Sequence, residues 1–279
     1  MTGSDSRHVG NKKWELELEG LLKLITTLHN RRGDPLLLLS LLKTLNREHL
    51  IESLGVAWSL PQGVTEPSWE DLVREEKQIQ ETLRSCVRMV HNSNLSWQAK
   101  SFLGRCYRSF QYEYMVALNL KRNNRNLRII LVDDPEVRNI RYKEIGNPEK
   151  LMTEIDRVPL ERQIEALRSR YAGYSSAYEE GERYKEMVLH PNSALLEIAL
   201  DMASFTDSRE EYIVRVIKES KPKVVLLRLI HCFADPPEGL RNRGLVASES
   251  LRARLGLRES DLMKLSEAEA IVGPLPKRD

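Results

Sequence analysis

A leucine-rich segment between Gly33 and Gly55 constrains the fold of this chain more than any other feature. Ten of the twenty residues from Pro35 to Leu54 are Leu or Ile. Asp34 can accept hydrogen bonds from the free amides of a first helical turn. Proline is tolerated at the first helical position, where an amide would have no partner in any case. We therefore predict a helix that begins at Asp34 and ends in a cap at Gly55.

The leucines of this predicted helix are too many for one stripe. One face carries four of them at helical spacing, namely Leu38, Leu41, Leu42 and Leu45. Three more lie outside that face and make the first turn apolar nearly all round: Leu36, Leu37 and Leu39. Such a turn is either buried among several helices or presented to a partner, and both interpretations stay open at this point.

The rest of the sequence predicts a mainly helical, multi-helix soluble protein with a minor β element. Apolar residues at helical spacing predict helices over 14–30, from Ser68 to about Val90, and over 96–119. The second of these begins with Ser68 and Asp71 in a capping-box pattern. A β-branched run before turn residues predicts a strand at 127–132. A lone strand needs a partner, for which 223–230 is the candidate, although this stretch fits a continued helix equally well.

The positions of proline, glycine and cysteine indicate the domain organisation and the cellular compartment. Pro and Gly in 60–69 mark a boundary between an N-terminal helical unit over 14–60 and a larger helical domain over 68–265, with tails at 1–13 and 266–279. Three cysteines at wide spacing provide no disulfide framework and indicate a reducing compartment. The polar start lacks the apolar core of a signal peptide, and no apolar run reaches the ~18–20 residues of a membrane span. We expect a cytoplasmic protein, with the nucleus as the alternative, and no membrane partner.

No common catalytic motif is present in the sequence. Glycine-rich phosphate loops, HExxH, paired CxxC and GxSxG are all absent. Cys86, His91 and Cys106 are too irregularly spaced to indicate a zinc site. Asp133 and Asp134 follow the predicted strand, where α/β enzymes often place acids, but Asp-Asp-Pro is also ordinary turn chemistry. We therefore expect no catalytic residue, cofactor or metal, and keep an enzyme that uses these two acids as an alternative.

The strongest electrostatic feature is the segment 84–128. Its nine Lys and Arg residues face one acid, Glu113, a net of +8, whereas the whole chain carries +2. Cations that pair with phosphates and rings that stack on bases are typical of nucleic-acid surfaces. The candidate binding residues, for a nucleic acid or an acidic protein, are Arg105, Arg108, Lys121, Arg122, Arg125 and Arg128. The alternative is a solvated face over a core stripe of Phe102, Cys106, Phe110 and Tyr114.

Residues 21–55 resemble the last two helices of death-fold domains, the death-effector type especially. The resemblance rests on a Leu-rich pattern that ends in Arg47, Leu50, Ile51 and Leu54, and it covers about 35 of 279 residues. His49 departs from the family, which has an acid there. The resemblance implies an adaptor without chemistry of its own, with Arg47 as a charge contact. Together with the absent motifs, it leads us to predict a non-enzymatic adaptor or scaffold that binds unidentified proteins through Leu36, Leu37 and Leu39.

Overall fold

The computed structural model describes residues 23–27, 34–47, 51–91, 94–110, 112–156, 207–228, 251–258, 261–264 and 272. Most of these residues are helical, which confirms the predicted mainly helical class. The predicted tail 1–13 and nearly all of the predicted tail 266–279 lie outside the described residues.

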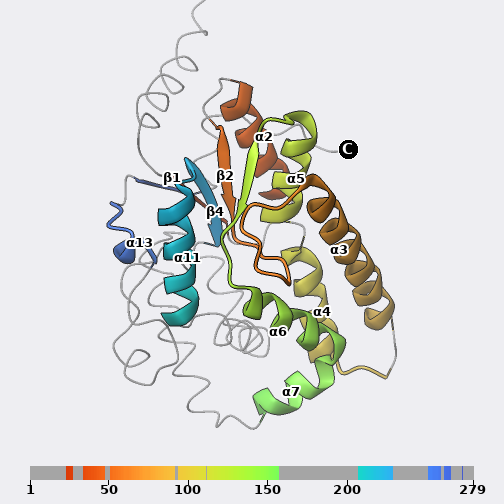
Figure 1. Ribbon diagram of the computed structural model, residues 1–279. Coiled ribbons are helices and arrows are strands. Elements are labelled where there is room, and N and C mark those ends of the chain that lie inside the picture. The colour runs from red at the N-terminus through yellow and green to blue at the C-terminus, as the bar shows by residue number, and fades with distance from the viewer. Residues whose placement is uncertain are drawn as a thin grey trace, which may run out of the picture.

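The β element is one sheet of five parallel strands, larger than the sequence predicts (Figure 1). Its order is β3-β2-β4-β1-β5. The strands are β1 (Lys23–Thr27), β2 (Ser53–Val56), β3 (Arg128–Leu131), β4 (Val224–Arg228) and β5 (Leu262–Lys264). The strands predicted at 127–132 and 223–230 are both present. They do not pair with each other, because β2 lies between them and hydrogen-bonds to both.

Helices cover both faces of this sheet. The larger apolar cluster lies on one face and includes Val224 and Leu226 of β4. The helices that pack there are α2 (Asp34–Arg47), α3 (Trp69–Val90), α4 (Trp97–Ser109) and α5 (Glu113–Asn123). Val225 and Leu227 point to the opposite face, as alternation along a strand requires. That face is covered by α11 (Asp207–Ser220) and α13 (Leu251–Arg254).

Two further helices follow β3. They are α6 (Pro135–Gly146) and α7 (Pro148–Asp156), and α7 contacts α4 and α6. The α3 helix begins as predicted, because Ser68 and Asp71 form both hydrogen bonds of a capping box. The helix predicted over 96–119 is instead two helices, α4 and α5, which are separated around Phe110 and Tyr112.

Three stretches that were predicted to be helical contain strands. Residues Lys23–Thr27, predicted within a helix over 14–30, form β1. The helix that begins at Asp34 ends at Arg47 and not at Gly55, which lies inside β2. Leu262–Lys264 form β5 within the domain over 68–265 that was predicted to be mostly helical. Strands from before and after residues 60–69 hydrogen-bond within this sheet, so the sheet does not divide at the predicted domain boundary.

Gly55 has a steric role in the sheet instead of a helix cap. A Cβ atom at this position would lie 2.9 Å from Val225 Cγ2 and 3.3 Å from Pro222 Cγ. We expect Gly55→Ala to lower the free energy of unfolding by about 1–3 kcal/mol through overpacking, measured by urea denaturation.

Two variants serve as controls for Gly55→Ala. Gly104→Ala adds a methyl group on α4 at a position where no atom outside the adjacent backbone of the helix lies within 4 Å, and it should stabilise the protein by about 0.5–1 kcal/mol. In a Val225→Ala background the penalty of Gly55→Ala should shrink, because the clashing methyl groups are gone. A penalty that is the same in both backgrounds would contradict this contact.

Candidate functional site at the carboxyl edge of the sheet

The sheet topology contains a switch point between β2 and β4. These strands are parallel neighbours, and the helices described in the connections that follow them pack on opposite faces of the sheet. The connection after β2 carries α3 on the face of the larger cluster, and α13, the first helix described after β4, packs on the other face. In open parallel sheets, ligands bind at such a switch point, outside the carboxyl ends of the strands.

The described part of this edge consists of the residues that follow β2 and β3. Trp58 and Ser59 come after β2, and Asp133 and Asp134 come after β3. The Asp133 amide donates to the Trp58 carbonyl at 3.1 Å, and Val132 donates to Val56 at 2.9 Å. The two strand ends are therefore held side by side beyond the last residues of the strands. Residues 28–33 and 229–250, which follow β1 and β4, lie outside the described residues.

Asp133 forms a buried ion pair with Arg209. Arg209 Nε donates to Oδ1 and Nη2 donates to Oδ2 of Asp133, both at 2.7 Å. The side chains are 2% and 5% exposed, so the pair is almost fully removed from water. It connects the end of β3 to the first turn of α11, across the face that α11 covers. Asp133 therefore contributes to the packing of α11 on the sheet.

Asp134 begins helix α6. Its Oδ1 accepts a hydrogen bond from the Glu136 amide at 2.9 Å, and Pro135 occupies the first turn. The Ser59 hydroxyl donates to the Asp134 carbonyl at 3.1 Å, which ties the residues after β2 to the start of α6. Both acids that the sequence singles out thus have defined structural contacts at this edge.

A second buried ion pair, which the sequence analysis missed, lies beside them. Glu75 of α3 accepts from Arg138 of α6 through both oxygens, at 2.9 and 2.7 Å. Trp58 Nε1 and the Tyr142 hydroxyl donate to the same carboxylate at 3.0 and 3.3 Å. The Arg138 guanidinium lies 4.3 Å from the centre of the Tyr142 ring. One carboxylate therefore joins α3, α6 and the residues after β2. We call these four residues the Glu75 network.

The sequence contains one signal for this network. Glu75 comes three residues after Leu72 and four before Ile79, both of which are buried. It therefore lies on the apolar stripe of α3, where an ionised side chain is stable only when it is paired.

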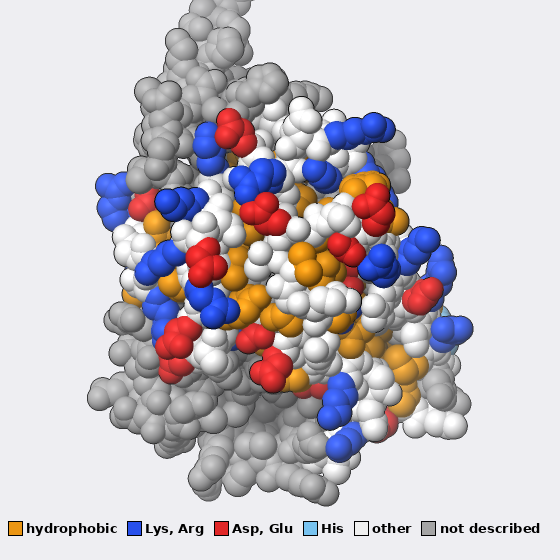
Figure 2. All heavy atoms as spheres, viewed as in Figure 1, with side chains coloured by type: hydrophobic (Ala, Val, Ile, Leu, Met, Phe, Trp, Pro, Cys, Tyr) orange, Lys and Arg blue, Asp and Glu red, His pale blue; other side chains and the backbone are white. Residues whose placement is uncertain are grey.

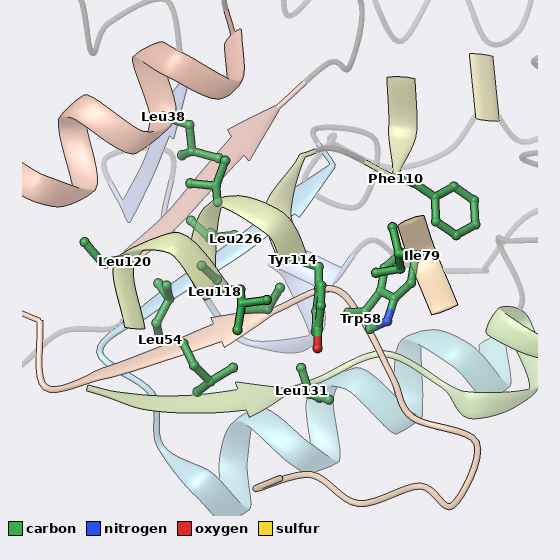
Figure 3. Close-up of a cluster of buried hydrophobic side chains, with 14 of the residues drawn as sticks. Leu38, Leu54, Trp58, Ile79, Phe110, Tyr114, Leu118, Leu120, Leu131 and Leu226 are labelled. Atoms are coloured by element: carbon green, nitrogen blue, oxygen red, sulfur yellow. The ribbon is translucent and has the colours of Figure 1, made fainter. Parts of the chain in front are cut away.

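A small cleft opens between the two ion pairs, and we call it the edge cleft. The space inside it that a water-sized molecule can occupy is about 10 Å³, room for about one water. The residues that line it are Trp58, Ser59, Phe110, Asp133, Arg138, Arg141 and Tyr142. Figure 3 shows Trp58 beside Ile79, with Tyr114 and Phe110 around it. The edge cleft thus combines an apolar wall with charged groups at the carboxyl ends of two parallel strands.

Burial raises the pKa of two tyrosines, Tyr142 of the Glu75 network and Tyr114, whose ring packs against Trp58 of that network. The pKa of Tyr142 is raised first by loss of solvent and then by the nearby Glu75 charge. The pKa of Tyr114 is raised by the same two causes, in the same order. Both hydroxyls donate in the folded protein, Tyr114 to the Leu72 carbonyl at 2.7 Å. The folded state therefore retains both phenolic protons at a pH at which an exposed tyrosine ionises.

These raised pKa values predict a loss of stability in alkali. In the unfolded chain the phenols ionise near pH 10.0, and the folded state keeps its protons. Above that pH the unfolded state binds fewer protons, so the free energy of unfolding should fall by about 1.4 kcal/mol per pH unit for each tyrosine. Urea denaturation between pH 9 and 11.5 measures this slope. A Tyr114→Phe, Tyr142→Phe double variant should reduce it, and an unchanged slope would contradict the assignment.

The leucines predicted to bind a partner lie in different environments. Leu37 is 3% exposed and belongs to the core, and Leu39 is half-buried against the same cluster. Leu36 is 39% exposed. Arg47 is the last residue of α2, and its side chain lies outside what the structure describes. The apolar first turn is therefore mainly a core feature, with Leu36 as its exposed member.

Several of the predicted basic residues form ion pairs with acids or hydrogen bonds with backbone carbonyls of the same chain. Arg122 is paired with Glu76, and Arg128 Nη2 lies 2.6 Å from Glu66 Oε1. Lys121 donates to the carbonyls of Arg125 and Leu127 at 2.7 and 2.5 Å. Arg125 is exposed, and the side chains of Arg105 and Arg108 lie outside the described set. Figure 2 shows basic and acidic side chains interspersed on the face in view.

Most rings of this segment are unable to stack on bases, because they are core residues. The buried ones are Phe102, Phe110, Tyr112 and Tyr114. Tyr107 is partly buried, and Trp97 is 53% exposed. The core stripe that the sequence offered as the alternative is therefore present: Phe102, Cys106, Phe110 and Tyr114 all belong to the larger cluster.

The described residues contain no group of three or more His, Cys, Asp or Glu side chains placed to hold a metal ion. Cys86 is 1% exposed, and burial raises the pKa of its thiol to about 11. A thiol with so high a pKa is a poor nucleophile at neutral pH. Among the described helices, none is long and apolar enough to cross a membrane.

The fold and this edge define a class: a mainly helical α/β protein with helices on both faces of a parallel sheet. Comparison with known proteins identifies no relative of this chain. No protein-family model, curated protein or solved structure matches the chain.

Proposed function

We propose that this chain binds a small molecule at the carboxyl edge of its sheet, at the switch point between β2 and β4. One observation carries the proposal: β2 and β4 are parallel neighbours, and the helices described after them, α3 and α13, pack on opposite faces of the sheet. In this arrangement the loops on either side diverge and leave room for a ligand between them.

The residues at this edge add support. Trp58 and Ser59 follow β2, which borders this switch point, and together with Asp133 after β3 they line the edge cleft on the other side of β2. The two buried ion pairs fix the walls of this cleft, because each joins a strand end or α6 to a helix that covers the sheet. A wall that is rigid before binding lowers the cost of ordering a complex. The proposal therefore concerns binding, and it gives Asp133 and Asp134 a structural role.

The experiment that tests this function is a thermal-shift screen followed by methyl NMR. The screen contains nucleotides, sugar phosphates, amino acids, aromatic acids and divalent metals. A ligand at 100 times its Kd should stabilise the protein by about 2.7 kcal/mol. In NMR spectra, such a ligand should shift the methyl signals of Val132, at the carboxyl end of β3, and leave those of Leu127, at its amino end, unchanged. Shifts at Leu127 alone, or no stabilising compound in the whole screen, would contradict the proposal.

A second candidate is the protein-binding adaptor predicted from the sequence. The observation that favours it is Leu36, which stays 39% exposed on a helix whose other leucines pack inward. Leu36→Glu should then prevent capture of a protein partner and leave the circular dichroism spectrum unchanged. Capture that survives this substitution would remove Leu36 from the proposal.

A further inference from the structure

The cations of 84–128 whose side chains the structure describes fall into two groups. In the first group, Arg122 and Arg128 are paired with glutamates, and Lys121 donates to two backbone carbonyls. In the second group, the side chains have no hydrogen bond or ion pair within the described part of the chain: Arg84, Arg88, Lys100 and Arg125. The cations of this second group can pair with an anion without first giving up a partner.

Two of these free cations belong to one exposed stripe at the end of α3. Arg84 and Arg88 are both exposed and lie one helical turn apart, about 6 Å along the axis, on the same face. Val87 lies between them on this face and is 43% exposed. His91, which ends the helix, is exposed and continues the stripe.

Helix α4 packs against α3, and its first turn lies at the same end of the pair as the last turn of α3 (Figure 1). Its first residue, Trp97, is 53% exposed. Lys100 follows one turn later on the same side of the helix and is partly exposed. We call six residues the α3–α4 tip: Arg84, Val87, Arg88, His91, Trp97 and Lys100.

Acidic side chains are scarce at the α3–α4 tip. The sequence contains no Asp or Glu from 82 to 112. Glu81 is exposed on α3, one turn before Arg84. Glu149 of α7 lies at the start of α4, where its two oxygens accept from the Ser96 amide at 2.6 Å and the Ser96 hydroxyl at 3.2 Å. The tip therefore combines three free cations with an exposed indole ring.

From these observations we propose that the α3–α4 tip binds single-stranded nucleic acid. Trp97 stacks on an unpaired base, and Arg84, Arg88 and Lys100 pair with phosphates. Cations along the nucleic-acid backbone and a ring that receives a base are the two components of such sites. An acidic protein would need the cations but not the ring. Because the tip shares no residue with the carboxyl edge, this inference goes beyond the small-molecule proposal and is tested independently of it.

The test is fluorescence anisotropy of the full chain with a labelled oligouridine of about six nucleotides, within the size range of one stacking site. We expect binding at about 50 mM salt that weakens as salt rises, because each phosphate contact releases counterions. A DNA duplex of equal charge should bind more weakly, since its paired bases offer no face to Trp97.

Two variants of Trp97 test the role of the ring. Trp97→Ala should weaken oligouridine binding about five- to 150-fold, the range for one stacked base. Trp97→Tyr retains a ring and should weaken binding less than about threefold, because stacking tolerates a change of ring. Trp97 is more than half exposed, so both variants should keep the circular dichroism spectrum of the unmodified protein.

Single substitutions of the arginines test the phosphate contacts. Arg84→Ala and Arg88→Ala should each reduce the slope of log affinity against log salt by about 0.7, the value of one phosphate contact on a single strand. Arg215→Ala is the matched control, because it removes an exposed arginine from α11 on the opposite face of the sheet. This control should leave both the affinity and the slope unchanged.

Four results would overturn the inference. They are no binding of the oligouridine at about 50 mM salt, unchanged binding by Trp97→Ala, an effect of Arg215→Ala as large as that of Arg88→Ala, and tighter binding of a polyglutamate peptide than of the oligouridine. The last result would instead assign the tip to an acidic protein partner. None of them bears on the carboxyl edge, which the Val132 methyl signal reports separately.

Discussion

Replacing Glu75 by alanine should lower the free energy of unfolding by about 3–5 kcal/mol. The substitution leaves the Arg138 guanidinium, which is 6% exposed, without its carboxylate in a nearly dry environment. It also removes the acceptor of Trp58 Nε1 and of the Tyr142 hydroxyl. A buried charge without a partner costs far more than the net contribution of the pair, so the single substitution should be severe. Urea denaturation at neutral pH measures the loss.

Two controls isolate the charge from the helix. Glu81→Ala removes an exposed glutamate from the same helix and should change stability by less than about 0.5 kcal/mol. Replacing both Glu75 and Arg138 by methionine should recover much of the loss, because apolar residues of similar volume often substitute for a buried ion pair. A cost below about 1 kcal/mol for Glu75→Ala would contradict the network described here.

Leu37→Glu should also lower the free energy of unfolding by at least about 3 kcal/mol, whereas Leu36→Glu should cost less than about 1 kcal/mol. The two leucines are adjacent on α2, yet Leu37 is 3% exposed and Leu36 is 39% exposed. At position 37 the substitution removes about 1.5–3 kcal/mol of apolar burial and places a carboxylate in the core. Thermal and urea denaturation of the two variants measure the difference.

This matched pair also decides how the leucine-rich turn is used. If Leu37→Glu is as stable as Leu36→Glu, the first turn of α2 is not in the core, and the surface interpretation from the sequence gains support. A large difference in stability confines any partner contact on this turn to Leu36. Both proteins carry the same change of composition and charge, so neither of these effects can account for such a difference.

Local chemistry made several elements predictable. Asp34 with Pro35, and Ser68 with Asp71, marked the beginnings of α2 and α3, because residues of these types are favoured where a helix leaves amides unpaired. The β-branched run Ile129, Ile130 and Val132 lies in and after β3, and the turn residues that follow it begin α6. These features depend on residues within a few positions of each other, so they are visible in one sequence.

The missed strands lack such signals. Strands buried on both faces of a parallel sheet are short apolar runs without alternation, and their residues can fall at helical spacing by chance. In β1 this chance helical spacing occurs around Ile25. In β2, Gly55 is the residue type that commonly ends a helix, and the sequence pattern therefore predicted a helix cap there. The choice between helix and strand was made by pairing with β4, far along the chain.

The candidate site was visible only in part. Asp133 and Asp134 were noticed because they follow a strand, but their partners were not predictable. Arg209 is 76 residues from Asp133, and Arg138 is 63 residues from Glu75. No local pattern specifies which buried cation meets which buried acid, because the pairing depends on how α6 and α11 pack. The position of Glu75 on an apolar stripe was the available clue.

The strand order has a consequence for biosynthesis. Among the described strands, β1 has hydrogen-bonded neighbours only in β4 and β5, and the residue that pairs with Lys23 is Val224. A ribosome must therefore add roughly 200 residues after β1 before this strand can join the sheet, and contacts of such long range are slow to form. Until then β2 and β3 can pair with each other. During this time Lys23–Thr27 remains unpaired in the nascent chain, where it can bind chaperones or associate with other chains.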